Sequence, residues 1–207
     1  MIKEKRSLFS FRGKFPRLFY FRRMQNNKTQ IKKLALAALF AATTFAVSLL
    51  EIPVFPQIGL KLDFSFAVML IGGYILGVFY GEMIIIATML LNLIKTQSLG
   101  IGELANFIMA NCFITIPVFV YKFRKGLKAV IVTLALSSLL QIGVALLCNR
   151  FIFYPLYENF LQMTAKEAFM KSWYLIIAFN ALKCFLNALI TVLLYKKLKK
   201  VLNKYFD

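Results

Sequence analysis

Several amide side chains and one ammonium lie inside long apolar stretches of this sequence: Asn92, Asn106, Asn111, Gln141, Asn180, Lys183 and Asn187. Four further polar residues lie at the ends of such stretches: Glu51, Asp63, Glu103 and Asn149. Amides both donate and accept hydrogen bonds, whereas an ammonium only donates them. This set predicts a pocket for a neutral, flat, hydrogen-bonding small molecule.

Lys183 is the sharpest of these signals. Asn180 and Lys183 are three residues apart, so they share one face of a helix. A charge near hydrocarbon costs about 3 kcal/mol on insertion scales, and such a group therefore faces a partner inside the bundle. Two interpretations stay open: a structural ion pair with Glu51 or Glu103, and a hydrogen bond to a ligand.

The composition indicates an integral membrane protein. Of the 207 residues, 60% are hydrophobic, and the mean hydropathy is +0.73, which is too apolar for a soluble domain of this length. The net charge of +18 comes from basic clusters that flank apolar runs, which fits the positive-inside rule better than a nucleic-acid groove. The sequence has no histidine, the commonest general base and metal ligand, so we expect no metal site and no catalytic residues.

Six apolar runs predict an all-α bundle of six transmembrane helices, about 31–50, 64–80, 83–94, 103–120, 129–148 and 172–195. The predicted organisation is a basic cytoplasmic arm at 1–30 and a substrate-binding domain at 31–200. Gly81-Glu82 is expected to form a short turn. The Lys/Arg bias predicts that both termini are cytoplasmic, so the loops at 51–63, 95–102 and 150–171 face outward.

Two stretches are expected to make specific contacts. The segment 51–65 holds Pro53 and Pro56 among large apolar residues, so it predicts a stiff loop that lines a cavity. The run 31–50 carries small residues at helical spacing, which allow close helix approach. They suit a docking face for a partner helix or packing inside this protein, and spacing alone leaves both open. These residues are Ala37, Ala38, Ala41 and Ala42.

Three motifs resemble one known family, the riboflavin-specific S component of energy-coupling factor transporters. They are the stretches 61–65 (KLDFS) and 102–107 (GELANF), and Asn149 followed by YPLY at 154–157. The resemblance runs from about Lys32 to Lys197. It implies a transporter subunit in the cell membrane that binds riboflavin with high affinity on the outer side. It also implies partners, a transmembrane T component and two ATP-hydrolysing subunits, which drive delivery.

The resemblance also implies which residues act. The flavin pocket would be formed by the first loop and the outer ends of the helices expected at 103–120, 129–148 and 172–195, while the alanine face would contact the T component. The implied riboflavin-binding residues are Glu51, Leu62, Asp63, Phe64, Lys95, Asn106, Asn149, Tyr154, Asn180 and Lys183. Riboflavin would be the transported substrate, and no cofactor is expected.

Other functions fit the sequence less well. An S component for a different vitamin is the nearest alternative. A metal-independent intramembrane enzyme acting on lipids would need paired acidic residues or histidines, and Asp63 and Glu51 are too scattered. The chain has no phosphate-binding G-x-x-x-x-G-K-[ST] sequence, so ATP must be hydrolysed by another subunit.

Overall fold

The computed structural model describes residues 14–55, 59–96, 99–158 and 163–206, with side chains from Lys28 to Tyr195 outside the gaps between these ranges and at Lys197. Residues 1–36 and 37–207 form two compact units. The expected basic arm falls largely outside the described side chains. The expected Pro56 and Gln57 part of the first loop is also outside the described residues.

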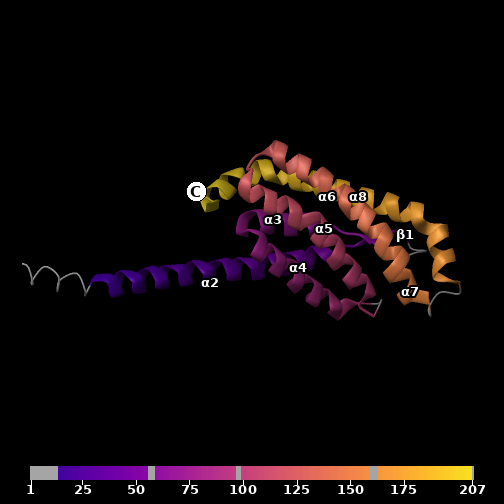
Figure 1. Ribbon diagram of the computed structural model, residues 1–207, viewed down its shortest axis with the longest axis horizontal. Coiled ribbons are helices and arrows are strands. Elements are labelled where there is room, and N and C mark those ends of the chain that lie inside the picture. The colour runs from indigo at the N-terminus through magenta and orange to yellow at the C-terminus, as the bar shows by residue number, and fades with distance from the viewer. Residues whose placement is uncertain (1–13, 56–58, 97–98, 159–162, 207) are drawn as a thin grey trace, which may run out of the picture. The chain divides into compact units, whose positions relative to one another are not determined.

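The described chain is mostly helical. The long helices are α2 (Lys14–Ser48), α3 (Ser65–Leu76), α4 (Val78–Asn92), α5 (Ile101–Phe123), α6 (Leu127–Cys148) and α8 (Ala165–Phe206). Short elements are η2 (Leu93–Lys95), a π-helical turn η3 (Asn149–Phe153) and α7 (Tyr154–Tyr157). Within residues 37–207, α5 packs against α4 and α6, and α8 packs against α3 and α6 (Figure 1). A bundle follows because hydrocarbon leaves backbone groups no partners outside a helix.

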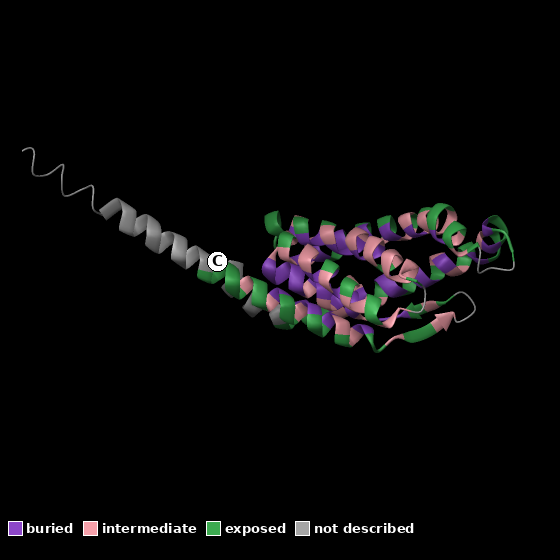
Figure 2. Ribbon diagram, turned by 90° about the horizontal axis from the view of Figure 1, so that it is seen from below, coloured by how far each residue is buried: buried purple, intermediate pink, exposed green. Residues whose placement is uncertain are grey.

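Five described helices are long and apolar enough to cross a bilayer, and α3 is shorter. With 12 residues, α3 would extend only about 18 Å. Ten of its residues, including Phe66 and Leu70, are buried, because α3 packs against α4, α5 and α8. Figure 2 shows buried residues concentrated on the facing sides of the helices, with exposed residues turned outward.

The turn expected at Gly81-Glu82 is wrong. The helix breaks at Gly77, whose φ of +90° strongly favours glycine, and Gly81 lies buried inside α4. Close packing requires glycines in α3 itself. A Cβ at Gly72 would lie 2.7 Å from Ile84 Cδ1, and one at Gly73 would lie 2.6 Å from Val118 Cγ2.

The segment after α2 is an antiparallel hairpin rather than an irregular loop. Strand β1 (Ile52–Phe55) pairs with β2 (Leu60–Leu62), with Ile52 opposite Leu62. Pro53 is tolerated because β1 has one paired partner in the described sheet. The loop expected at 150–171 is also partly helical, since η3 and α7 follow α6 directly and α8 begins at Ala165.

Candidate functional site

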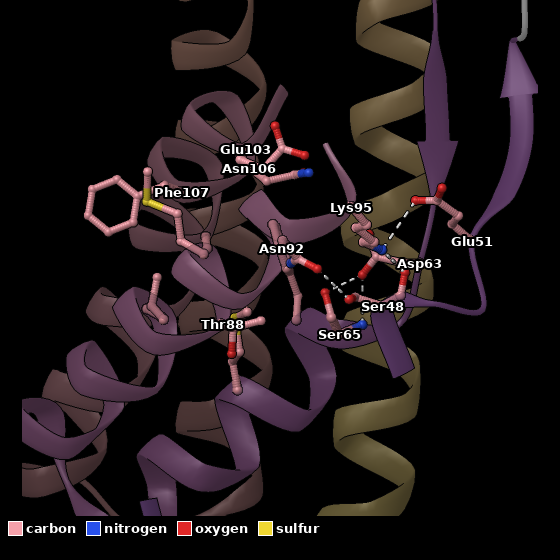
Figure 3. A pocket seen from close by; sticks show the side chains of 15 residues that line it. Ser48, Glu51, Asp63, Ser65, Thr88, Asn92, Lys95, Glu103, Asn106 and Phe107 are labelled. Carbon is pink, nitrogen blue, oxygen red and sulfur yellow. Dashed lines mark hydrogen bonds and ion pairs between the residues drawn. The ribbon is translucent and has the colours of Figure 1, made fainter. Parts of the chain in front are cut away.

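A cavity lies where the end of α2, the hairpin, and α3, α4 and α5 meet (Figure 3). The cavity has a volume of about 60 Å³, and the empty space in and around it, which includes open solvent, is about 520 Å³. The cavity is lined by Ser48, Glu51, Asp63, Ser65, Phe66, Met69, Ile85, Thr88, Met89, Asn92, Lys95, Glu103, Asn106, Phe107 and Ala110.

A buried ion pair forms part of the cavity wall. Lys183 Nζ lies 3.1 Å from Asp63 Oδ2 and donates a second hydrogen bond of 3.1 Å to Asn106 Oδ1. It also lies 4.3 Å from the centroid of the Phe66 ring, within cation–π range. The expected ion-pair partners, Glu51 and Glu103, were wrong. Asp63 is the partner because it lies just before α3, and α3 packs against α8, which carries Lys183.

Asp63 is held as a carboxylate by several donors. The backbone N–H of Ser65 donates to Asp63 Oδ1 at 2.8 Å, and the Ser65 hydroxyl donates to the same oxygen. Burial raises the pKa of Asp63. The Lys183 charge and these hydrogen bonds together lower it by more, so the pKa lies below its usual value. Asn187 of α8 fixes the strand end, since Nδ2 donates to the Asp63 carbonyl at 3.1 Å and Oδ1 accepts from Ala67 N at 2.9 Å.

A second set of charges ties the hairpin to the end of α4. Lys61 Nζ donates to Glu51 Oε1 at 2.6 Å, and Lys95 Nζ lies 3.7 Å from Glu51 Oε2. Lys95 also donates to the Ser48 carbonyl at 2.6 Å. These side chains are 27–42% exposed, so they form the solvent-facing edge of the cavity rather than its interior.

A separate polar layer joins α6 and α8. Gln141 Nε2 donates to Asn180 Oδ1 at 3.1 Å, and the Cys184 thiol donates to Gln141 Oε1 at 3.2 Å. Asn180 Nδ2 donates to the Ile176 carbonyl, one turn earlier in α8. Asn180 does not line the cavity, although it lies one helical turn from Lys183.

The structure therefore brings together five of the predicted ligand residues: Glu51, Asp63, Lys95 and Asn106 line the cavity, and Lys183 contacts two of them. The others lie apart from it. Leu62, the last residue of β2, is buried, and Phe64, which directly precedes α3, is half-buried. Asn149 donates to the Ala145 carbonyl, and the Tyr154 hydroxyl hydrogen-bonds Ser172.

The alanine face is divided between the interior and the surface. Ala37 and Ala41 are each 3% exposed, whereas Ala38 and Ala42 are exposed. The buried stripe continues through Thr44 to Ser48, which reaches the cavity. Ala37 and Ala41 therefore pack inside this protein, and only Ala38 and Ala42 are accessible to another helix.

Four small polar residues in the cavity lining were not among the implied riboflavin-binding residues: Ser48, Ser65, Thr88 and Asn92. One sequence signal could have found two of them. Thr88 and Asn92 are four residues apart in an otherwise apolar run, so they share one helix face.

The arrangement suits binding rather than catalysis. The carboxylates Asp63 and Glu51 are both paired with lysines, so these two add little net charge to the cavity lining. Glu103 is a third carboxylate of the lining, and its Oε2 accepts a hydrogen bond of 2.7 Å from the Thr96 hydroxyl. Amide and hydroxyl groups line one side, and Phe66, Met69 and Phe107 provide apolar surface. Such a lining fits a ligand that has both an aromatic body and neutral hydrogen-bonding groups.

The sequence matches the family described as "ECF transporter, substrate-specific component" over residues 32–195. The chain belongs to this family. It is a transporter component rather than an enzyme, and it is a multi-pass protein of the cell membrane. The matched residues run from within α2 to within α8. The cavity lining and the buried Lys183–Asp63 pair both lie inside this matched range.

Named relatives resemble this substrate-specific component along most of its length. Riboflavin transporter RibU of Staphylococcus aureus (strain TCH60) is 25% identical over 185 residues, covering 88% of this chain and 98% of the relative. Riboflavin transporter FmnP of Bacillus subtilis (strain 168) is 28% identical over 178 residues, covering 82% and 93%. A solved S component of a bacterial ECF transporter is 25% identical with a TM-score of 0.70, covering 84% of this chain and 98% of that one.

Proposed function

We propose that this substrate-specific component binds riboflavin from outside the cell and delivers it with an ATP-driven partner module. The observation that carries the proposal is the buried Lys183–Asp63 pair beside the cavity, in a family whose named relatives here are riboflavin transporters. The pair orients Asp63 and Asn106 at the cavity wall while adding no net charge. Riboflavin is neutral, flat and rich in hydrogen-bonding groups, so it matches this environment.

Riboflavin is the transported substrate in this proposal, and no cofactor takes part. Asn106 and Lys183 lie at the wall where the ring edge would bind, and Asn180 is one turn further along α8. Asn149 and Tyr154 would contribute from the outer end of α6 and from α7. Both now bond within their own region of the chain, so they must change partners to reach the ligand.

The topology in this proposal has six crossings and cytoplasmic termini. The short α3 would make the second crossing, and because α4, α5 and α8 cover it, it need not match the full hydrocarbon thickness by itself. Basic residues at the beginning of the chain, at 122–128 and at 196–200 would then share the cytoplasmic side. The hairpin and the cavity would face outward.

Flavin binding can be tested directly on detergent-purified protein. We expect the preparation to be yellow, to release flavin on denaturation, and to quench riboflavin fluorescence on rebinding. Thermal unfolding should shift upward with riboflavin, because a ligand that binds only the folded state stabilises it. A colourless protein that is stabilised by another vitamin instead would favour an S component of different specificity.

The proposed partners are a transmembrane T component and two ATP-hydrolysing subunits. The exposed Ala38 and Ala42 on α2 support a contact for the T component, because small residues let a second helix approach closely. Co-expression with such a module should give ATP-dependent riboflavin uptake. Uptake by this chain alone at the same rate would contradict the proposed division of labour.

A further inference from the structure

Glu82 differs in position from the other described carboxylates. The other five lie between elements or in the first turn of a helix: Glu51, Asp63, Glu103, Glu158 and Glu167. Each of those five accepts a hydrogen bond from a lysine, a hydroxyl or a backbone N–H. Glu82 instead lies in the second turn of α4, inside a helix that is apolar enough to cross a membrane.

Glu82 is held between two helices without a counter-ion. Helices α4 and α5 pack side by side (Figure 1), and Thr115 Oγ1 of α5 donates to Glu82 Oε1 at 2.6 Å. Among the described residues, Glu82 forms no ion pair. Lys122, two turns after Thr115 on α5, lies over the Phe123 ring instead. Glu82 is half-buried, so its side chain is in part accessible from outside the bundle.

The surface around Glu82 is otherwise apolar. Phe79 and Ile86, three residues before and four after Glu82 on the same face of α4, are 71% and 46% exposed. Phe119, one turn after Thr115 on α5, is 52% exposed. Exposed apolar side chains suit either lipid or another helix. A carboxylate does not suit lipid, because a charge that faces hydrocarbon needs a partner.

The depth of Glu82 favours a protein partner over a lipid headgroup. Glu82 is four residues after Val78, the first residue of α4, and therefore lies about 6 Å along the helix from its start. Headgroup amines lie at the level of helix ends, whereas a lysine or arginine of a neighbouring helix can reach this depth along its own apolar stem. In the proposed function, the T component supplies such a helix.

We infer that α4 and α5 form a second docking surface for the T component, and that Glu82 binds a lysine or arginine of that partner. The surface consists of Phe79, Glu82, Ile86 and Phe119. This inference rests on the proposed partnership and adds a charged contact to the small residues Ala38 and Ala42 on α2. In lipid, a polar contact between helices strengthens their association, so the pair fixes how the partner helix lies on this surface.

The test removes the charge while keeping the shape of the side chain. Glu82→Gln retains the oxygen that accepts from Thr115, and the variant is titrated in nanodiscs with the purified T component and ATPase subunits of the same cell. We expect Glu82→Gln to weaken this association about tenfold or more, and Glu82→Lys about a hundredfold, because like charges then meet. Riboflavin binding, measured by fluorescence quenching, should stay within about twofold for both variants, since Glu82 does not line the cavity.

Two controls separate the charge from general effects. Glu158→Gln changes a carboxylate that accepts from the backbone of Ala165 beyond the far end of α6, and it should leave association with the module unchanged. Acidic substitutions of membrane lysines and arginines of the T component, made one at a time, should restore binding of Glu82→Lys at one position.

Each remaining outcome has one meaning. If Glu82→Gln binds the module like the wild type, the docking contact is overturned while riboflavin binding and the partnership stand. If the loss occurs only in nanodiscs that contain phosphatidylethanolamine, and not in phosphatidylcholine, a lipid amine occupies the site and the inference is again overturned. If the wild type binds the module but not riboflavin, the proposed substrate fails while the docking contact stands. A wild type that binds no module refutes the partnership and the inference together.

Discussion

Removing the Lys183 ammonium should leave the Asp63 carboxylate buried without a counter-ion. Lys183→Met keeps the length of the side chain and its apolar stem while removing the charge. The two side chains are 3% and 11% exposed and lie 3.1 Å apart, so solvent screens the pair little. Removing one partner of a buried pair costs about 3–5 kcal/mol. We expect the free energy of unfolding to fall by about that amount.

The double variant Lys183→Met/Asp63→Asn is the matched control. It removes both charges, so no unpaired carboxylate remains, and most of the lost stability should return. Lys61→Met is a second control, because its partner Glu51 is at the solvent-facing edge, where the two side chains are 42% and 33% exposed. Breaking such an exposed pair should cost less than about 1 kcal/mol.

Denaturant unfolding of the purified protein in detergent micelles, followed by circular dichroism, gives all four stabilities. Each single and double variant is compared in the same detergent, so differences between them are independent of the micelle. If Lys183→Met unfolds like the wild type, the pair contributes nothing to folding. If the double variant is as unstable as Lys183→Met, the loss comes from packing rather than from the unpaired carboxylate.

The folded-state pKa of Asp63 lies below its ordinary 3.8, so the stability that it contributes should be complete above that value and decline as pH falls through the lowered pKa. Asp63→Asn should remove this acid-side decline in unfolding measured as a function of pH. Gly73→Ala should destabilise by about 1–3 kcal/mol, because its Cβ would lie 2.6 Å from Val118 Cγ2, and adding Val118→Ala should recover part of the loss in thermal unfolding. Ala41→Leu should destabilise the bundle by about 1–3 kcal/mol because Ala41 is buried, whereas Ala42→Leu should leave unfolding and riboflavin binding unchanged but lower uptake with the partner module.

The helices could be predicted well where apolar runs have clear ends. The expected runs 103–120 and 129–148 lie within α5 and α6; α5 begins two residues earlier and ends three later than expected, and α6 begins two residues earlier and ends at the expected residue. Polar or basic residues interrupt the apolar pattern near the ends of these two helices, so the sequence itself indicates where they begin and end. The break between α3 and α4 could not be located in this way.

Gly77 and Gly81 show why that break was misplaced. Gly77 is required by its positive φ, whereas Gly81 is required by the approach of Gly73, since a Cβ there would lie 3.3 Å from Gly73 Cα. Both requirements select glycine, so the residue type alone cannot distinguish a turn from a close helix contact. The charge of Glu82 favoured the wrong choice, although Glu82 Oε1 accepts a hydrogen bond of 2.6 Å from Thr115 within the bundle.

The members of the site could be predicted better than their pairings. Lys183, Asn106 and Asp63 stand out because they are polar beside apolar runs, and that pattern is visible in the sequence. Their contacts join residues as far as 120 positions apart, so they depend on the vertical register between α3, α5 and α8. Three carboxylates were available near that level, and only packing selects Asp63.

The pairing of Lys183 limits which ligands the cavity can accept. Asp63 and Asn106 take two of the three N–H donors of the ammonium, as far as the described residues show. A neutral ligand beside this wall leaves the ion pair intact. An anionic group would compete with Asp63 for the same lysine and would bring a second negative charge beside a buried carboxylate. Because that competition is unfavourable, the geometry favours an uncharged vitamin over an anionic one at this wall.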